Sequence, residues 1–178
     1  MSDVMSANRP AVARLATDVR RIVARGLVSA DTAQAVADLL SRRALGARDL
    51  LTEEERQGDP DGYASYVLYS HPDFSIAGVV WRPGQVTVIH DHVAWCAFGV
   101  LSGIEHETLY RLDGDRLVET REVDNLPGDS NGFAPPGDIH MVRNTSREVG
   151  VSVHVYGADL ARLGSSVRRT YDLPVTTA

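Results

Sequence analysis

The stretch 81–103, WRPGQVTVIHDHVAWCAFGVLSG, constrains the fold more than any other part of the chain. It places His90 and His92 two residues apart within a run of Val, Ile, Thr and Trp, residue types that β-strands favour. Side chains at positions i and i+2 of a strand point to the same face. Two imidazoles on one face of an apolar strand are poorly explained as exposed or packed histidines, and this pattern indicates half of a metal site.

Strand-like segments continue through the chain after residue 62. They are rich in β-branched and aromatic residues and cover 63–70, 74–82, 86–92, 95–101, 106–112, 116–123, 132–135, 140–144 and 149–157. Many short strands separated by Gly and Pro are typical of a β-sandwich or barrel. We expect the segment 168–174 to add an edge strand or a covering arm.

The first 62 residues carry a helical pattern instead. Apolar residues recur at helical spacing over 11–25, Ser29 and Asp31 are suited to cap a second helix, and a third helix is expected over 47–56. We therefore expect a helical segment, residues 1–62, packed on a β-barrel domain, residues 63–178, in one structural unit.

Composition excludes several classes of function. A net charge of −6 argues against a nucleic-acid partner, which requires a basic face. There is no long apolar run for a membrane partner and no N-terminal secretion pattern, so we expect a cytoplasmic protein. The single cysteine, Cys96, fits a reducing compartment. The oligomeric state stays open.

A third histidine, His140, follows a Pro-Pro-Gly turn and precedes an apolar strand. With His90 and His92 it would form a three-imidazole set that leaves coordination positions open for substrate, as a catalytic metal site requires. Iron(II) suits oxygen chemistry, and Zn, Ni, Cu and Co also accept imidazole ligands.

The two histidine segments resemble the two cupin motifs. The matching residues are Gly84, His90, His92 and Gly103 in the first motif and Pro135, Gly137, His140 and Asn144 in the second. The usual glutamate after the second histidine is absent from 93–97, as in the thiol dioxygenases, which bind iron through three histidines. The resemblance implies a mainly β protein, a cupin double-stranded β-helix or jelly-roll barrel with an N-terminal α-helical cap, that holds Fe(II).

A third cluster strengthens this resemblance. Ser152, His154 and Tyr156 alternate along one strand and so share a face. Thiol dioxygenases carry a Ser-His-Tyr relay at this place, and residues 63–174 are similar to bacterial cysteine and 3-mercaptopropionate dioxygenases. The resemblance implies a catalytic role for these three residues, with a small thiol and O2 as partners and a sulfinic acid as product. The alternative reading is a polar strand face satisfied by its own hydrogen bonds.

The substrate is less constrained by the resemblance. Cysteine dioxygenases carry an arginine for the substrate carboxylate before the first motif, and residues 63–66 contain none. We therefore expect a 3-mercapto acid rather than cysteine, with Arg168, Arg169 or Arg82 as candidate substrate-binding residues. Alternatively, the short side chains at 64–65 leave room for a larger substrate.

Two neighbours of the histidines have expected structural roles. Asp91 should point away from the ligands and support the strand. Cys96 is expected to be a small buried residue facing away from Tyr156, without a cross-link to it. The alternative functions are a cupin metalloenzyme that acts on a non-thiol metabolite and a non-catalytic cupin that binds a ligand.

Overall fold

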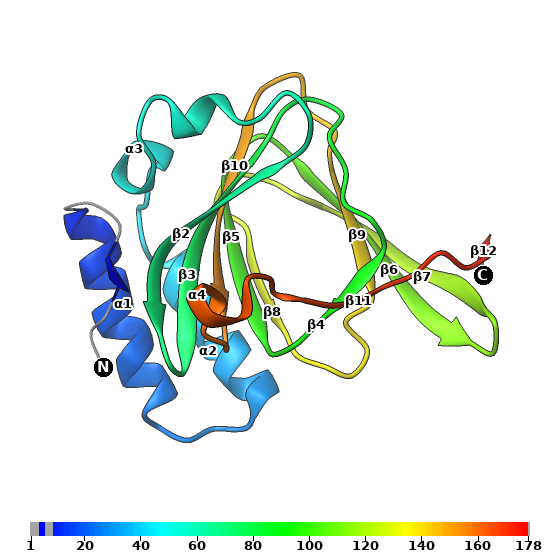
Figure 1. Cartoon of the computed structure of the whole chain (residues 1–178), viewed down its shortest axis with the longest axis horizontal. Helices are drawn as coiled ribbons and strands as arrows, with labels where there is room; N and C mark the ends of the chain where they lie inside the picture. The colour runs from blue at the N-terminus through cyan, green and yellow to red at the C-terminus, as the bar shows by residue number, and fades with distance from the viewer. Residues whose placement is uncertain (1–3, 6–8, 178) are drawn as a thin grey trace.

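Two β-sheets that face each other form the body of the molecule in the computed structural model, which describes residues 4–5 and 9–177 (Figure 1). The first sheet has the order β1-β2-β3-β10-β5-β8. Its strands are β1 (Val4–Met5), β2 (Ala64–His71), β3 (Phe74–Trp81), β10 (Gly150–Tyr156), β5 (Cys96–Ser102) and β8 (Ser130–Phe133). The second has the order β11-β4-β9-β6-β7-β12. Its strands are β11 (Val167–Thr170), β4 (His90–His92), β9 (His140–Asn144), β6 (Glu105–Asp113), β7 (Arg116–Asn125) and β12 (Val175–Thr177).

The connections between the sheets define the fold. From β3 to β10 the chain passes repeatedly from one sheet to the other, and only the hairpin β6–β7 stays within one sheet. All strand pairs are antiparallel except β12 with β7. This is the jelly-roll topology of a double-stranded β-helix, so the predicted fold class is confirmed.

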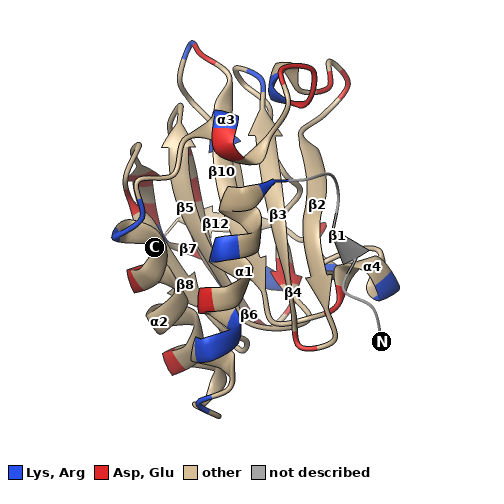
Figure 2. Ribbon diagram, turned by 90° about the vertical axis from the view of Figure 1, so that its left-hand side faces the viewer, with Lys and Arg blue, Asp and Glu red and all other residues tan. Residues whose placement is uncertain are grey.

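Helices cover the outer face of the first sheet (Figure 2). They are α1 (Pro10–Val23), α2 (Ser29–Ser41), α3 (Ala47–Leu50) and the 3-10 turn η1 (Glu55–Gln57). A further short helix, α4 (Leu160–Leu163), follows β10. The helical spacing of apolar residues in α1 and α2 buries Leu15 and Val36 in one cluster with Ile76 and Val80 of β3. None of the helices in the described ranges is long and apolar enough to cross a membrane.

Strand β3 is covered on both faces, by the helices and by the second sheet, and this explains its sequence. All of its residues are buried, which fits its continuous apolar run. Alternation sends Ile76 and Val80 toward the helices, whereas Val79 and Trp81 face the second sheet, where they pack with Val142. The first sheet therefore packs against the helices with its outer face and against the second sheet with its inner face.

Two expected elements differ in length. The third helix ends at Leu50 because Leu51 is extended, with φ −125° and ψ 143°, which buries both leucines. The Leu50 carbonyl accepts a hydrogen bond of 2.7 Å from the Arg9 guanidinium instead of continuing the helix. The strand expected over 86–92 is reduced to β4, and before it only Val86 forms an isolated bridge, to Arg143. The expected C-terminal edge strand is present as β11, paired with β4.

Candidate metal centre

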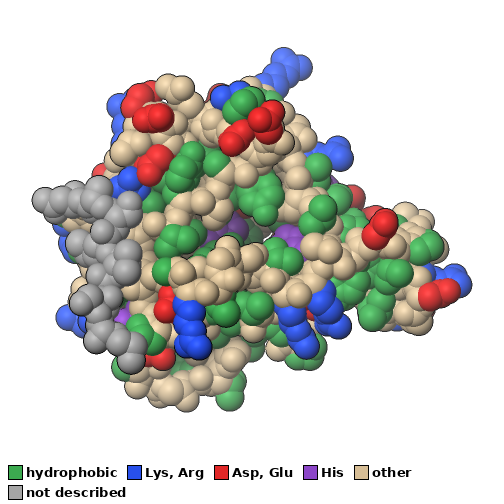
Figure 3. All heavy atoms as spheres, viewed as in Figure 1, with side chains coloured by type: hydrophobic (Ala, Val, Ile, Leu, Met, Phe, Trp, Pro, Cys, Tyr) green, Lys and Arg blue, Asp and Glu red, His purple; other side chains and the backbone are tan. Residues whose placement is uncertain are grey.

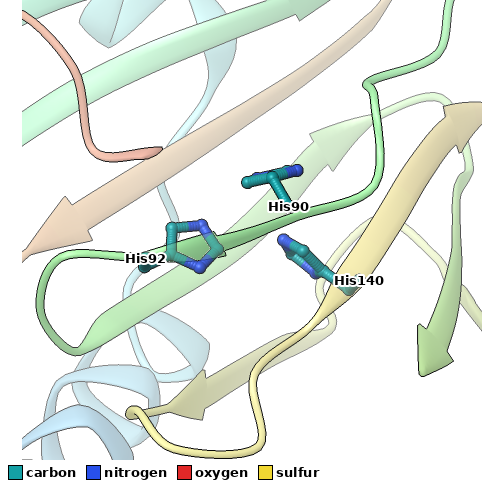
Figure 4. Close-up of side chains that lie close together, drawn as sticks. All are labelled: His90, His92 and His140. Carbon is teal, nitrogen blue, oxygen red and sulfur yellow. The ribbon is translucent and has the colours of Figure 1, made fainter. Parts of the chain in front are cut away.

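Three histidines converge between the sheets. His90 and His92 lie on the same face of β4, and His140 begins β9 directly opposite His90 in the strand register. One ring nitrogen from each residue lies within 4.8 Å of the others, and all three side chains are buried (Figure 4). The structure thus brings together the three residues that the sequence suggested as metal ligands.

A hydrogen bond fixes the Nδ1 side of every ring. The acceptors are the Val88 carbonyl for His90 at 2.9 Å, the Asp138 carboxylate for His92 at 3.2 Å, and the Glu107 carboxylate for His140 at 2.6 Å. Because a neutral imidazole carries one proton, a ring that donates from Nδ1 keeps the lone pair on Nε2. Such partners orient a ligating histidine and raise its basicity.

The environment keeps the rings of His90 and His92 neutral. Burial, together with the neighbouring His140, lowers the pKa of His90 to about 3. Burial also lowers the pKa of His92, although the Asp138 carboxylate opposes this effect. Burial raises the pKa of Asp138, but hydrogen bonds from His92 outweigh it and leave the pKa below its usual value. Neutral imidazoles with free lone pairs fit a divalent transition-metal ion.

The polar side chains of β10 form a chain of hydrogen bonds beside the histidines. The Ser152 hydroxyl lies 2.9 Å from Nε2 of His154, and Nδ1 of His154 lies 3.1 Å from the Tyr156 hydroxyl. Burial, with His92 nearby, lowers the pKa of His154 to about 3, and burial raises the pKa of Tyr156 well above its usual value. The pair is therefore a neutral imidazole and a protonated phenol, suited to holding or moving a proton.

A cavity of about 240 Å³ joins these groups. It is bordered by the three histidines, by His154 and Tyr156, and by side chains of β2, β3 and the segment 164–167. In the space-filling view, histidine atoms are visible at the bottom of a hollow in the middle of the molecule (Figure 3). A small molecule that enters this hollow meets the imidazoles and the tyrosine together.

The predicted substrate-binding arginines lie elsewhere. The Arg82 guanidinium donates to the carbonyls of Gln57 and Gly58, because the turn after β3 directs it toward η1. Arg168 and Arg169 border a separate depression on the outer face of the second sheet. The strand register pairs Arg169 with Asp91, whose side chain points outward, and so carries the guanidinium away from the cavity.

Asp91 has the supporting role that alternation predicts. Its Oδ2 accepts hydrogen bonds from Nε of Arg169 at 3.0 Å and from the Tyr171 hydroxyl at 2.9 Å. These bonds tie β11 and the following segment to β4, which carries the two histidines.

The expectation that Cys96 faces away from Tyr156 is wrong. The two residues are directly opposite each other in the register of β5 and β10, and they belong to one buried cluster. The Cys96 sulfur also lies 3.9 Å from Nδ1 of His154. The expectation relied on the spacing of Cys96 from His92, whereas the pairing of β5 with β10 decides which way the side chain points. Burial raises the pKa of its thiol well above the usual value.

Three acidic residues around the centre were missed in the sequence. Glu107 and Asp138 hold His140 and His92, and Glu105 is buried beside them. Burial raises the pKa of Glu105 to about 7, although the Ser152 hydroxyl and the Trp81 indole favour its charged form. The signal was available, because Glu105 and Glu107 stand two residues apart in a strand just as His90 and His92 do.

Comparisons with known proteins bear on this site. The family model described as cysteine dioxygenase type I matches residues 1–165, a range that includes the three histidines and the Ser152–His154–Tyr156 chain. Among solved structures, the chain is similar to a cupin superfamily protein from Desulfitobacterium hafniense, with 15% identity over 66% of this chain and 93% of that chain and a TM-score of 0.48. It is also similar to a conserved protein with a double-stranded β-helix domain from Klebsiella pneumoniae, with 20% identity over 61% and 89% of the two chains and a TM-score of 0.45.

Proposed function

The chain belongs to the cysteine dioxygenase type I family, and from this premise we propose that it is an iron(II)-dependent thiol dioxygenase. Its partners are O2 and a small thiol. In the reaction a thiol and one molecule of O2 give a sulfinic acid, so that both oxygen atoms are bonded to sulfur. Sulfur loses four electrons and O2 gains them, and no further oxidant or reductant is needed.

The observation that carries the proposal is that the three imidazoles and the Tyr156 hydroxyl border the same cavity. His90, His92 and His140 would hold the metal through Nε2, since their Nδ1 atoms are already engaged. Bound iron(II) supplies the redox chemistry that allows O2 to react with a thiolate.

Ser152, His154 and Tyr156 together hold and orient one proton. When Ser152 donates to Nε2 of His154, the ring carries its proton on Nδ1 and donates it to the Tyr156 oxygen. The Tyr156 O–H is then free to donate into the cavity, toward oxygen atoms that gain negative charge during the reaction. Ser152 and His154 act as positioning residues, and Tyr156 is the group that meets the reactants.

The test is aerobic incubation of the iron-loaded protein with a panel of thiols under ¹⁸O2. Oxygen uptake is recorded, and the products are examined by mass spectrometry. We expect a sulfinate that carries two labelled oxygen atoms and one O2 consumed for each thiol. His140→Ala is the control for reaction of free iron in solution.

Two other functions give different results in the same assay. A cupin enzyme with a non-thiol substrate would leave every thiol unchanged, and thiols would not perturb the electronic spectrum of its metal. A ligand-binding cupin would hold metal in stoichiometric amount without oxygen uptake across a broader substrate panel. We also propose that the protein is located in the cytoplasm, where thiols are kept reduced.

A further inference from the structure

The cavity above the histidines has an unusual chemical lining. Among the residues that the structure describes, no Arg, Asp or Glu borders it, and the sequence contains no Lys at all. Its walls consist of aliphatic and aromatic side chains, hydroxyl groups and imidazoles, among them Ser65, Val79, Trp81 and Thr87.

None of the three arginines considered for substrate binding borders this space. Arg82 is engaged with the carbonyls of Gln57 and Gly58, and Arg169 is engaged with Asp91 on the outer face. Arg168 borders the same outer depression as Arg169. A substrate carboxylate in the cavity would lose water without gaining a guanidinium partner, and burial of an unpaired charge is costly.

A positively charged head group has no partner either. Ammonium groups are strongly hydrated, and the cavity lining offers only hydroxyl groups in place of that water. Ser65 and Thr87 provide hydroxyls, and Val79 and Trp81 provide apolar surface beside them. In the view into the hollow, the rim consists mainly of hydrophobic and uncharged groups (Figure 3).

From this lining we infer that the substrate is a thiol with no charged group other than its sulfur. The inference rests on the proposed function and narrows it, since it excludes zwitterionic cysteine and replaces the 3-mercapto acid expected from the sequence. The uncharged part of the substrate packs on the apolar walls, and a hydroxyl or amide on it bonds to the serine and threonine hydroxyls.

The test compares small thiols of similar length in the wild-type protein. These are 3-mercaptopropionate, its amide 3-mercaptopropionamide, 3-mercaptopropan-1-ol, 2-aminoethanethiol and cysteine. Binding is measured without O2 on the cobalt(II)-loaded protein, where a thiolate produces a charge-transfer band, and kcat/KM is measured on the iron-loaded protein. We expect the amide and the alcohol to bind at least about tenfold more tightly than the three charged thiols.

A matched pair of variants tests the cause. Ser65 borders the cavity from β2, opposite Val79 in the register. Ser65→Arg should improve binding of 3-mercaptopropionate about tenfold relative to its amide, because it supplies the missing guanidinium. Ser65→Gln, which is long and neutral, should bring no such gain for 3-mercaptopropionate. Thermal unfolding of both variants shows whether they fold, and the wild-type comparison stands without them.

The outcomes separate this inference from the proposed function. If 3-mercaptopropionate, cysteine or 2-aminoethanethiol binds as tightly as the neutral thiols, the inference is wrong while thiol oxidation stands. If no thiol produces the cobalt band or consumes O2, the proposed function fails and this inference fails with it.

Discussion

The Nδ1 atom of His140 lies 2.6 Å from Oε1 of the buried Glu107 carboxyl, and this contact joins β9 to the neighbouring β6. Since it fixes the ring so that Nε2 faces His90 and His92, Glu107 is expected to control metal binding. We predict that Glu107→Ala weakens metal affinity about 10–100-fold. Glu107→Gln, whose amide oxygen still accepts the hydrogen bond, should lose less. Competition with a chromogenic chelator measures both.

The control for this prediction is Asp113→Asn, at the exposed end of the same strand, which should bind metal like the wild type. Equal affinity in Glu107→Ala and the wild type would show that the contact does not orient the ring.

The second prediction separates the role of binding the metal from the role of donating a proton. His140→Ala should lose the metal, because two imidazoles remain. Tyr156→Phe should keep the metal and lower turnover by about 10²-fold, since it removes only the O–H at the end of the Ser152–His154 chain. Metal content by elemental analysis and kcat by oxygen uptake are measured on the same samples. Equal metal loss in both variants would contradict the separate roles.

The third prediction concerns pH. Burial raises the pKa of Glu105 from 4.5 to about 7. Between these values the unfolded chain releases the proton and the folded chain keeps it, so this group makes the protein less stable as the pH rises through the window. Above the pKa of the folded state, the loss of unfolding free energy reaches its full value of about 3 kcal/mol.

Glu105→Gln removes this contribution. The unfolding free energy of the variant minus that of the wild type should therefore increase from about pH 4.5 to about pH 7 and then level off. Urea denaturation across this range measures it. Glu148→Gln, at an exposed position, is the matched control for the substitution itself. A difference for Glu105→Gln that does not vary with pH would mean that the carboxyl ionises normally.

The fourth prediction concerns how helix α2 sits on the sheet. A Cβ atom added at Gly132 of β8 would lie 2.4 Å from the Ala33 carbonyl oxygen in α2, and this neighbour is backbone that cannot rotate away. We expect Gly132→Ala to lower the unfolding free energy by about 1–3 kcal/mol. Gly62→Ala, with nothing within 4 Å of the new atom, is the matched control and should cause no loss. Thermal and urea unfolding measure the unfolding free energy of both variants, and equal values would contradict the prediction.

Patterns that repeat within a single strand were readable from the sequence. The spacing of His90 and His92 predicted a shared face, and the same alternation placed Asp91 on the opposite face. The alternation of Ser152, His154 and Tyr156 predicted that the three side chains share a face, and hydrogen bonds connect them along the strand. These inferences succeeded because the strand itself dictates where successive side chains point.

Contacts between strands were decided only by the tertiary structure. The position of Cys96 beside Tyr156 follows from the register of β5 on β10, which the spacing of Cys96 from His92 does not determine. Arg82, Arg168 and Arg169 were expected near the substrate. Arg82 and Arg169 bond to partners outside the cavity, and Arg168 borders the outer depression. Local periodicity thus indicated two of the three residues of the candidate metal site, because one strand fixes where its own side chains point. Strand pairing brought His140 to them and directed Arg169 to Asp91 on the outer face, and the cavity is left without a charged wall.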